Sequence, residues 1–207
     1  KELKKPIRLM IGFNRRFAPH IIKMKSLIKS KKEPKIIIIT VNAGQIPSEH
    51  WTQDKTVGGG RIIGECCHFV DLMRFLVESR IISHQSNMIG SDQSIEVRSD
   101  KVSINLSFED GSIGTIHYLS NGGKAFPKER IEVFCGGSAL QLDNFRTLKG
   151  FDWPNFKKMS LIKQDKGQKA CTKAFIDAII QGLPSPIPFD EIIECSRVSI
   201  EVAESLG

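Results

Sequence analysis

The chain has 207 residues, of which 40% are apolar and 26% charged, with a formal net charge of +7 at pH 7. This length and apolar content suffice for one sizeable core, or for a large and a small domain, and argue against a disordered chain. The positive charge suggests nucleic-acid binding, but many lysines fall in short runs such as "KSKKEPK", which are ordinarily solvated. The chain has a single tyrosine, and its aromatic residues do not alternate with basic ones as in RNA-binding motifs. We therefore expect no nucleic-acid partner.

Apolar runs and cysteines indicate the compartment. The longest apolar runs, such as "IIIITV" at 36–41, are far shorter than the roughly 20 residues that span a bilayer, so no membrane partner is expected. Five cysteines, an odd number, occur without a visible signal peptide. This combination predicts reduced thiols in a cytoplasmic protein.

The first part of the chain predicts a strand, a helix and a second strand. The apolar run "IRLMIGF" at 7–13 predicts a buried strand, and helically spaced apolar residues predict a helix at 16–31, before Pro34. The run "KIIIITVNAG" at 35–44 is β-branched enough for a strand. The polar segment 45–57 predicts a loop.

The rest of the chain predicts one long helix, a sheet and two closing helices. The helix is expected between Gly60 and Ser79, where five apolar residues share one face: Ile62, Cys66, Phe69, Met73 and Leu76. Alternating segments at 102–108, 112–119, 130–134 and 139–145 predict antiparallel strands with one covered face. Helices at 168–182 and 189–206 would pack on that face. The fold class is therefore α+β, a large, mostly antiparallel sheet with helices on one face.

The stretch "GGGRIIGECCHF", 58–69, permits three interpretations. Its glycines approach a dinucleotide fingerprint, but the preceding residues are loop-like rather than a strand, so tight turning into a helix is the simpler role. Glu65 and His68 form half of a di-iron motif without a second copy, and Cys66–Cys67 lacks zinc spacing, so no metal is expected. In the third interpretation, His68 is a catalytic base whose ring is oriented, and whose pKa is raised, by Glu65 and Asp71 one turn away.

Longer motifs resemble a known family. "VNAGQIPSEHW....GGGRIIGECCHFVDLMRFL" (41–76), preceded by "MIGFNRRFAP" (10–19) and followed by "FEDGSIGTIHYLSNGGKAFPKERIEVFCGG" (108–137), is similar to the Gfo/Idh/MocA oxidoreductases, the glucose-fructose oxidoreductase and inositol dehydrogenase superfamily. In that family a Rossmann domain that binds NAD or NADP precedes a domain with a large, mostly antiparallel sheet. The resemblance implies that 1–33 is a remnant of the Rossmann domain, ending in its last strand-helix unit, and that 34–207 is the substrate-binding and oligomerisation domain.

The resemblance also implies site residues. The family helix reads G-G-G-x-x-x-D-x-G-x-H, which places the histidine on His68 and the aspartate on Gly64. Glu65 is the nearest carboxylate that could take over the catalytic role of that aspartate. Lys5 in "KKP" lies too close to "GFNRRF" to be the family's catalytic lysine, which is expected upstream of residue 1.

The implied chemistry is hydride transfer between nicotinamide and a carbon of a sugar, nucleotide sugar or cyclitol, with His68 as base or proton relay. Asn14 and Arg15 would border the cofactor, and five residues are candidates for substrate contact: Asn42, His50, Trp51, Lys124 and Lys128. The two lysines could hold an anionic group, or they could be solvated hairpin lysines. This chain alone is expected to be inactive, and the sheet face is expected to form a homodimer or homotetramer. A non-catalytic ligand-binding or oligomerisation domain of the same fold is the alternative.

Overall fold

The central strand of the sheet is β1 (Ile36–Asn42), as its β-branched run predicts. In the computed structural model, which describes residues 8–207, β1 lies between β4 (Ile113–Leu119) and β5 (Glu129–Cys135). It runs parallel to β4 and antiparallel to β5, and the other neighbouring pairs are antiparallel. The order is β2-β3-β4-β1-β5-β6-β7-β8. The remaining strands are β2 (Ile81–Met88), β3 (Lys101–Phe108), β6 (Ser138–Asp143), β7 (Thr147–Phe151) and β8 (Lys158–Ser160).

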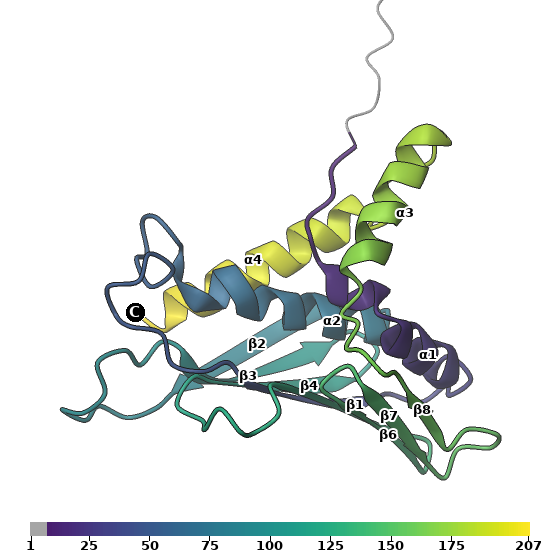
Figure 1. Ribbon diagram of the computed structural model, residues 1–207, viewed down its shortest axis with the longest axis horizontal. Helices are drawn as coiled ribbons and strands as arrows, with labels where there is room; N and C mark the ends of the chain where they lie inside the picture. Colours follow the sequence, from purple (N-terminus) through teal and green to yellow (C-terminus); the bar gives the residue numbers. More distant parts are fainter. Residues whose placement is uncertain (1–7) are drawn as a thin grey trace, which may run out of the picture.

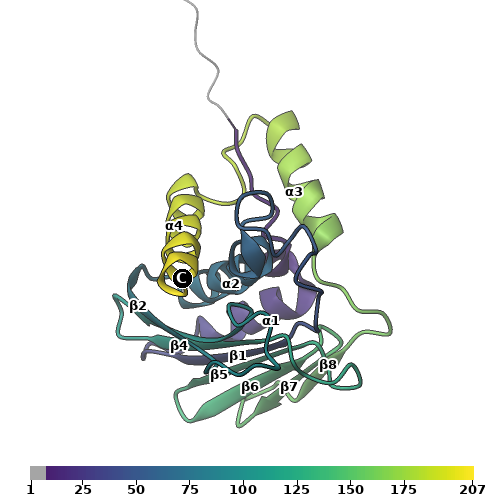
Figure 2. The ribbon, with the colours of Figure 1, turned by 90° about the vertical axis from the view of Figure 1, so that its left-hand side faces the viewer.

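The helices lie on one side of this sheet (Figures 1 and 2). They are the 3-10 turn η1 (Asn14–Phe17), α1 (Pro19–Ile28), the π-helical turn η2 (Ile62–Cys66), α2 (Cys67–Val77), α3 (Gln168–Ile180) and α4 (Phe189–Ser205). The sheet is eight-stranded and mostly antiparallel, which confirms the predicted α+β class. No helix within residues 8–207 is long and apolar enough to cross a membrane.

One continuous core fills the space between the sheet and the helices. On β1, Ile37 and Ile39 are fully buried, whereas Ile36 on the opposite face is 47% exposed, as a period-2 strand requires. All five apolar residues of the predicted helix at 60–79 are buried in this core. Burial of each such large side chain contributes about 1.5–3 kcal/mol. Buried side chains of α1 join the same core; the division at residues 33 and 34 stays a prediction.

The predicted strand at 7–13 is wrong for residues 8–13, which form no strand; Ile7 lies outside the described residues. The backbone N–H groups of Phe13 and Asn14 donate to the carbonyls of Ile11 and Gly12, so the segment turns tightly into η1. No strand of the described sheet runs beside it to satisfy an extended backbone. Apolar content therefore marks Phe13 as a core residue, but it does not make the segment a strand.

The closing helices were also predicted only in part. Helix α4 packs on α2 and on β2, as expected, but α3 packs against η1 and stands clear of the sheet (Figure 1). Only Cys171 and Ala178 of α3 are buried, although apolar residues recur at helical spacing along this helix. The strands β2, β7 and β8 were missed, since their short or polar sequences lack clear alternation.

Candidate functional site

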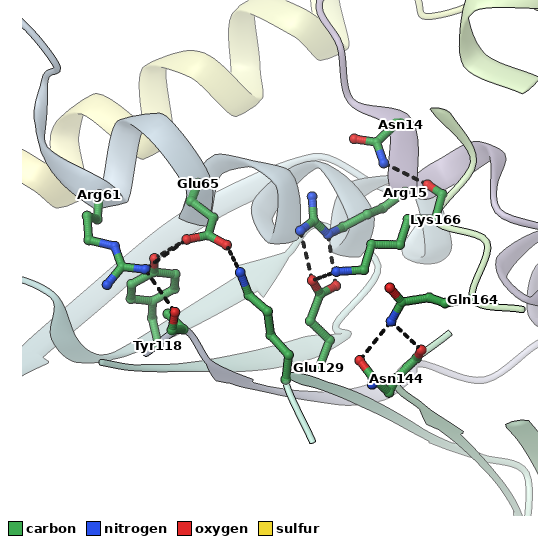
Figure 3. Close-up of polar contacts among 11 residues, drawn as sticks. Asn14, Arg15, Arg61, Glu65, Tyr118, Glu129, Asn144, Gln164 and Lys166 are labelled. Atoms are coloured by element: carbon green, nitrogen blue, oxygen red, sulfur yellow. Dashed lines mark hydrogen bonds and ion pairs between the residues drawn. The ribbon is translucent and has the colours of Figure 1, made fainter. Parts of the chain in front are cut away.

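The topology gathers polar side chains at one edge of the sheet. Because β1 and β4 are parallel, their carboxyl ends meet there, and β5 begins at the same edge. The loop after β1 leads into η2 and α2, which lie over this edge (Figure 3). Residues of η1 and of the segment that precedes α3 reach the same place. Side chains from five parts of the chain therefore meet around α2.

The helix over this edge begins with a π-helical turn, η2, where the sequence predicted regular α-helix. A π turn bonds residue i to i+5, so the angular positions around it differ from those of a wheel drawn at 100° per residue. The directions of the side chains at 62–66 therefore cannot be taken from a regular α-helical wheel. Such turns often occur at functional sites.

Glu65 is held by three donors. Lys128 Nζ donates to Oε1 at 2.7 Å, while the Tyr118 hydroxyl and Arg61 Nη2 donate to Oε2 at 2.5 and 3.1 Å (Figure 3). Burial opposes ionisation, but the hydrogen bonds from Lys128, Tyr118 and Arg61 prevail and lower the pKa of Glu65 to about 2. Burial, and then the charge of Glu65, raise the pKa of Tyr118, which therefore remains a donor. Glu65 is thus a fixed anion rather than a proton acceptor near neutral pH.

This arrangement predicts a specific acid sensitivity. A carboxylate whose folded pKa lies below its usual value stabilises the protein above that usual value, and the contribution is lost as pH falls. For Glu65, with an ordinary pKa of 4.5 and a folded pKa of about 2, the loss falls between these values and amounts to about 3 kcal/mol. Urea unfolding at pH 6 and pH 3 should therefore show a smaller fall in unfolding free energy for Glu65→Gln than for the parent protein. Glu109→Gln, at an exposed position, is the control and should reproduce the parent's fall.

His68 lies on α2, one turn beyond Glu65, and its ring meets that of Phe13 edge-on at 5.9 Å between centroids. Its Nδ1 is buried and has no hydrogen-bond partner within the described residues. Burial, and then the nearby charge of Arg15, lower the pKa of His68 to about 4. The sequence predicted the opposite direction. It failed because burial and the charge of Arg15 outweigh the carboxylates Glu129 and Glu65, which do raise this pKa, while Asp71 is paired with the guanidinium of Arg16.

A second ion cluster lies beside His68. Arg15 donates from Nε and Nη2 to the two carboxylate oxygens of Glu129, each at 3.0 Å, and stacks over Phe69 at 4.5 Å. Lys166 Nζ donates to the same carboxylate at 2.6 Å, and Asn14 donates to the Lys166 carbonyl at 2.7 Å (Figure 3). Glu129 is fully buried. Asn14 and Arg15, predicted to border the cofactor, thus lie next to His68, with both side chains held by the protein.

The predicted substrate residues separate into two groups. Asn42, Lys124 and Lys128 line one open groove of about 960 Å³ that also includes Asp143 and Arg146. Asn42 donates to the carbonyls of Gly123 and Phe126, so it holds the loop that carries the two lysines. His50 and Trp51 lie apart from this groove on the exposed loop after β1, where His50 contacts Thr52.

The other chemistry considered for 58–69 finds no support in the geometry. A side chain at Gly58 would collide with the backbone of Trp51 and Thr52, so this glycine allows a tight turn, as the simpler interpretation predicts. The backbone φ angles of Gly59 and Gly60 are +71° and +78°. Across residues 8–207, no three His, Cys, Asp or Glu side chains gather as a metal ion would need. Cys66 is fully buried in the core.

Four residues of this site were not singled out from the sequence: Arg61, Tyr118, Glu129 and Lys166. Glu129 had a usable signal, because it falls in phase with the inward-facing Ile131 and Val133 of its strand. A charged residue on the buried phase of a strand implies a partner of opposite charge. Arg61 lies in the first helical turn before η2 and Lys166 lies in a loop, and neither carried a comparable signal.

Comparison with known proteins decides the family. The family model described as "GFO/IDH/MocA C-terminal domain" matches residues 21–140, more than half of the chain. The chain belongs to the Gfo/Idh/MocA family. Among curated proteins of known sequence, the chain is 25% identical over 148 residues to "Uncharacterized oxidoreductase YrbE" of Bacillus subtilis, covering 69% of this chain and 42% of that protein.

Solved structures related to the Gfo/Idh/MocA domain share its fold. The aldose-aldose oxidoreductase from Caulobacter crescentus, complexed with glycerol, matches with a TM-score of 0.75 and 17% identity, over 97% of this chain and 63% of that one. GenD2 from gentamicin A biosynthesis, in complex with NAD, matches with a TM-score of 0.69 and 18% identity, over 96% and 61%. The chain thus spans less than two thirds of the length of each of these relatives.

Proposed function

We propose that this chain is the substrate-binding part of a nicotinamide-dependent oxidoreductase that acts on a sugar, nucleotide sugar or cyclitol. The observation that carries the proposal is His68, a neutral imidazole with an unpartnered buried Nδ1 near two anchored carboxylates, Glu65 and Glu129, in a chain of this family. The aldose-aldose oxidoreductase and the NAD complex among its structural relatives support the substrate class and the cofactor class.

The proposed division of labour follows from the protonation states. A bound nicotinamide would accept the hydride from the substrate carbon. His68 is neutral at physiological pH and can accept the proton of the reacting hydroxyl. Glu65 stays charged, and with Arg61 and Tyr118 it fixes the position of Lys128. We therefore propose that Glu65 orients neighbouring groups and does not itself transfer a proton.

This chain would contact the nicotinamide ring of a bound cofactor rather than its phosphates. The unpartnered Nδ1 of His68 and the neighbouring Asn14 and Arg15 fit that end. Residues 8–207 offer no strand, glycine turn and helix that would cradle the phosphates, so the rest of the cofactor would be bound by another part of a longer protein. For the same reason, we expect the chain alone to show no turnover.

The test uses the full-length gene product that contains this chain. Fluorescence titration should detect binding of NADH or NADPH, and an absorbance assay should detect reduction of NAD or NADP in the presence of aldoses, nucleotide sugars or inositols. If neither cofactor binds and none of these compounds is oxidised, the proposal is wrong, and the non-catalytic alternative takes its place.

The proposed location is the cytoplasm, supported by five free cysteines.

We also propose that the open face of the sheet joins copies of the protein into a homodimer or homotetramer. One row of side chains crosses five neighbouring strands on this face: Ile113, Ile36, Phe134, Ala139 and Phe151. Four of the five are 42–50% exposed large apolar residues, and together they form a patch typical of interfaces.

Charge placed in this row should break the assembly. Ile36→Glu, in the middle of the row, is expected to shift the mass measured by light scattering from an oligomer to a monomer, because a carboxylate at an apolar interface loses its hydration. Ile176→Glu on α3, at a similarly exposed position of 49%, is the matched control and should leave the mass unchanged. A monomeric parent protein, or an unchanged mass in Ile36→Glu, would contradict this proposal.

A further inference from the structure

The charges around His68 do not balance. Four cations, namely Arg15, Arg61, Lys128 and Lys166, contact only two carboxylates, Glu65 and Glu129. Arg61 also lies 3.7 Å from Asp100, but Lys101 pairs with that carboxylate at 2.7 Å. Two positive charges therefore remain without a carboxylate of their own. An excess of one sign in a partly buried site favours a ligand of the opposite sign.

The two lysines supply this excess. Glu129 is already satisfied by the bidentate contact of Arg15, and Glu65 by Arg61 and the Tyr118 hydroxyl. The positive charges of Arg15 and Arg61 are thus enough to balance the two carboxylates, without those of Lys128 and Lys166. Each ammonium group has three donors and uses one on its carboxylate, and no further partner for either is found within residues 8–207.

The spare donors are accessible from the site. The side chain of Lys128 is 41% exposed and that of Lys166 is 17% exposed, whereas Arg15 and Arg61 are nearly buried. Glu65, which holds Lys128, lies one helical turn from His68, and both Lys166 and its partner Glu129 are near enough to act on the charge of His68. Lys128 also borders the open groove of about 960 Å³, a volume that accommodates a sugar.

We propose that Lys128 and Lys166 bind an anionic group, a carboxylate or a phosphate, of the sugar-type substrate whose reacting hydroxyl faces His68. Lysine suits this task because its ammonium is a point charge that pairs with carboxylate or phosphate oxygens in several orientations. Glu65 and Glu129 hold the two ammonium groups in place. This inference rests on the proposed function for the role of His68, but anion binding can be measured separately from catalysis.

The first experiment compares probes that differ in one group. Glucose, glucuronate, glucose 6-phosphate and inorganic phosphate are titrated into the full-length protein by calorimetry, at low and at high salt. At least one anionic probe should bind about tenfold more tightly than glucose, and high salt should weaken that binding. Glucuronate as the preferred probe identifies a carboxylate site; glucose 6-phosphate identifies a phosphate site. If no anionic probe binds more tightly than glucose, the inference is wrong.

Variants then test the two residues. Lys128→Gln and Lys166→Gln should each weaken binding of the preferred anionic probe about tenfold, because a charge-assisted hydrogen bond is lost. Lys128→Arg and Lys166→Arg should retain most of the affinity, which separates lost charge from misfolding. Lys31→Gln removes the same charge from another part-buried lysine, which donates to Gly136 and Ser138, and should change nothing. An equal loss in Lys31→Gln would overturn the assignment.

The two proposals fail in different ways. If the protein oxidises neutral sugars and the lysine variants leave their turnover unchanged, the oxidoreductase proposal stands and the anion site is wrong. If anionic probes bind through the two lysines but no sugar is oxidised with either cofactor, the site stands and the enzymatic proposal is wrong.

Discussion

Replacement of His68 by alanine should lower the kcat of the full-length protein by about 10²–10⁴-fold, the usual contribution of a positioned general base. The expectation rests on its buried, unpartnered Nδ1 and on its neutral state. The pH dependence has a definite sign. Because the pKa of His68 is lowered to about 4, the base is charged and inactive below that pH. The contribution of His68 to kcat/KM should therefore rise through about pH 4 and stay level toward neutrality.

The control for this prediction is another histidine outside the site. His84 on β2 contacts Glu201 at 3.1 Å, and His84→Ala should leave kcat within twofold of the parent value. Steady-state kinetics with the preferred substrate and cofactor measure both variants. If His68→Ala keeps more than a tenth of the parent kcat, His68 is not the proton acceptor, and the fold assignment remains unaffected.

The sequence predicted those parts of the fold in which local pattern and tertiary packing agree. The run at 36–41 became the central strand, and the apolar stripe from Ile62 to Leu76 became the buried face of one helix. The segment 7–13 failed because apolar content alone does not supply a neighbouring strand. Strand β2 was missed because its residues, "IISHQSNM", are largely polar, and it forms through pairing with β3.

The site was predictable to a smaller extent, because its contacts are distant in sequence. His68 and Glu65 were found from one helix, but the partners that set their charge states come from elsewhere. Arg15 and Glu129 are 114 residues apart, and Tyr118 is 53 residues from Glu65. No local pattern encodes such pairs, so the direction of the pKa shift of His68 could not be inferred from its helix alone. The π-helical turn also follows from tertiary packing rather than from residue spacing.

Replacement of Glu129 by glutamine should lower the free energy of unfolding by about 3–5 kcal/mol, the usual cost of breaking a buried ion pair from one side. The variant keeps the shape of the side chain but leaves two cations, Arg15 and Lys166, without their counter-charge in a site where Glu129 is fully buried. Chemical denaturation of the chain at neutral pH measures the change.

A matched control separates the cost of leaving buried charges unpaired from the cost of losing an ion pair at the surface. Asp177 pairs with Lys173 on the exposed surface of α3, and Asp177→Asn should cost less than about 0.5 kcal/mol because water replaces the lost partner. A second variant, Arg15→Leu combined with Glu129→Leu, removes the main pair from both sides and should recover part of the loss. If Glu129→Gln costs no more than Asp177→Asn, Glu129 does not anchor η1 to the sheet, and the fixed position of Arg15 beside His68 needs another cause.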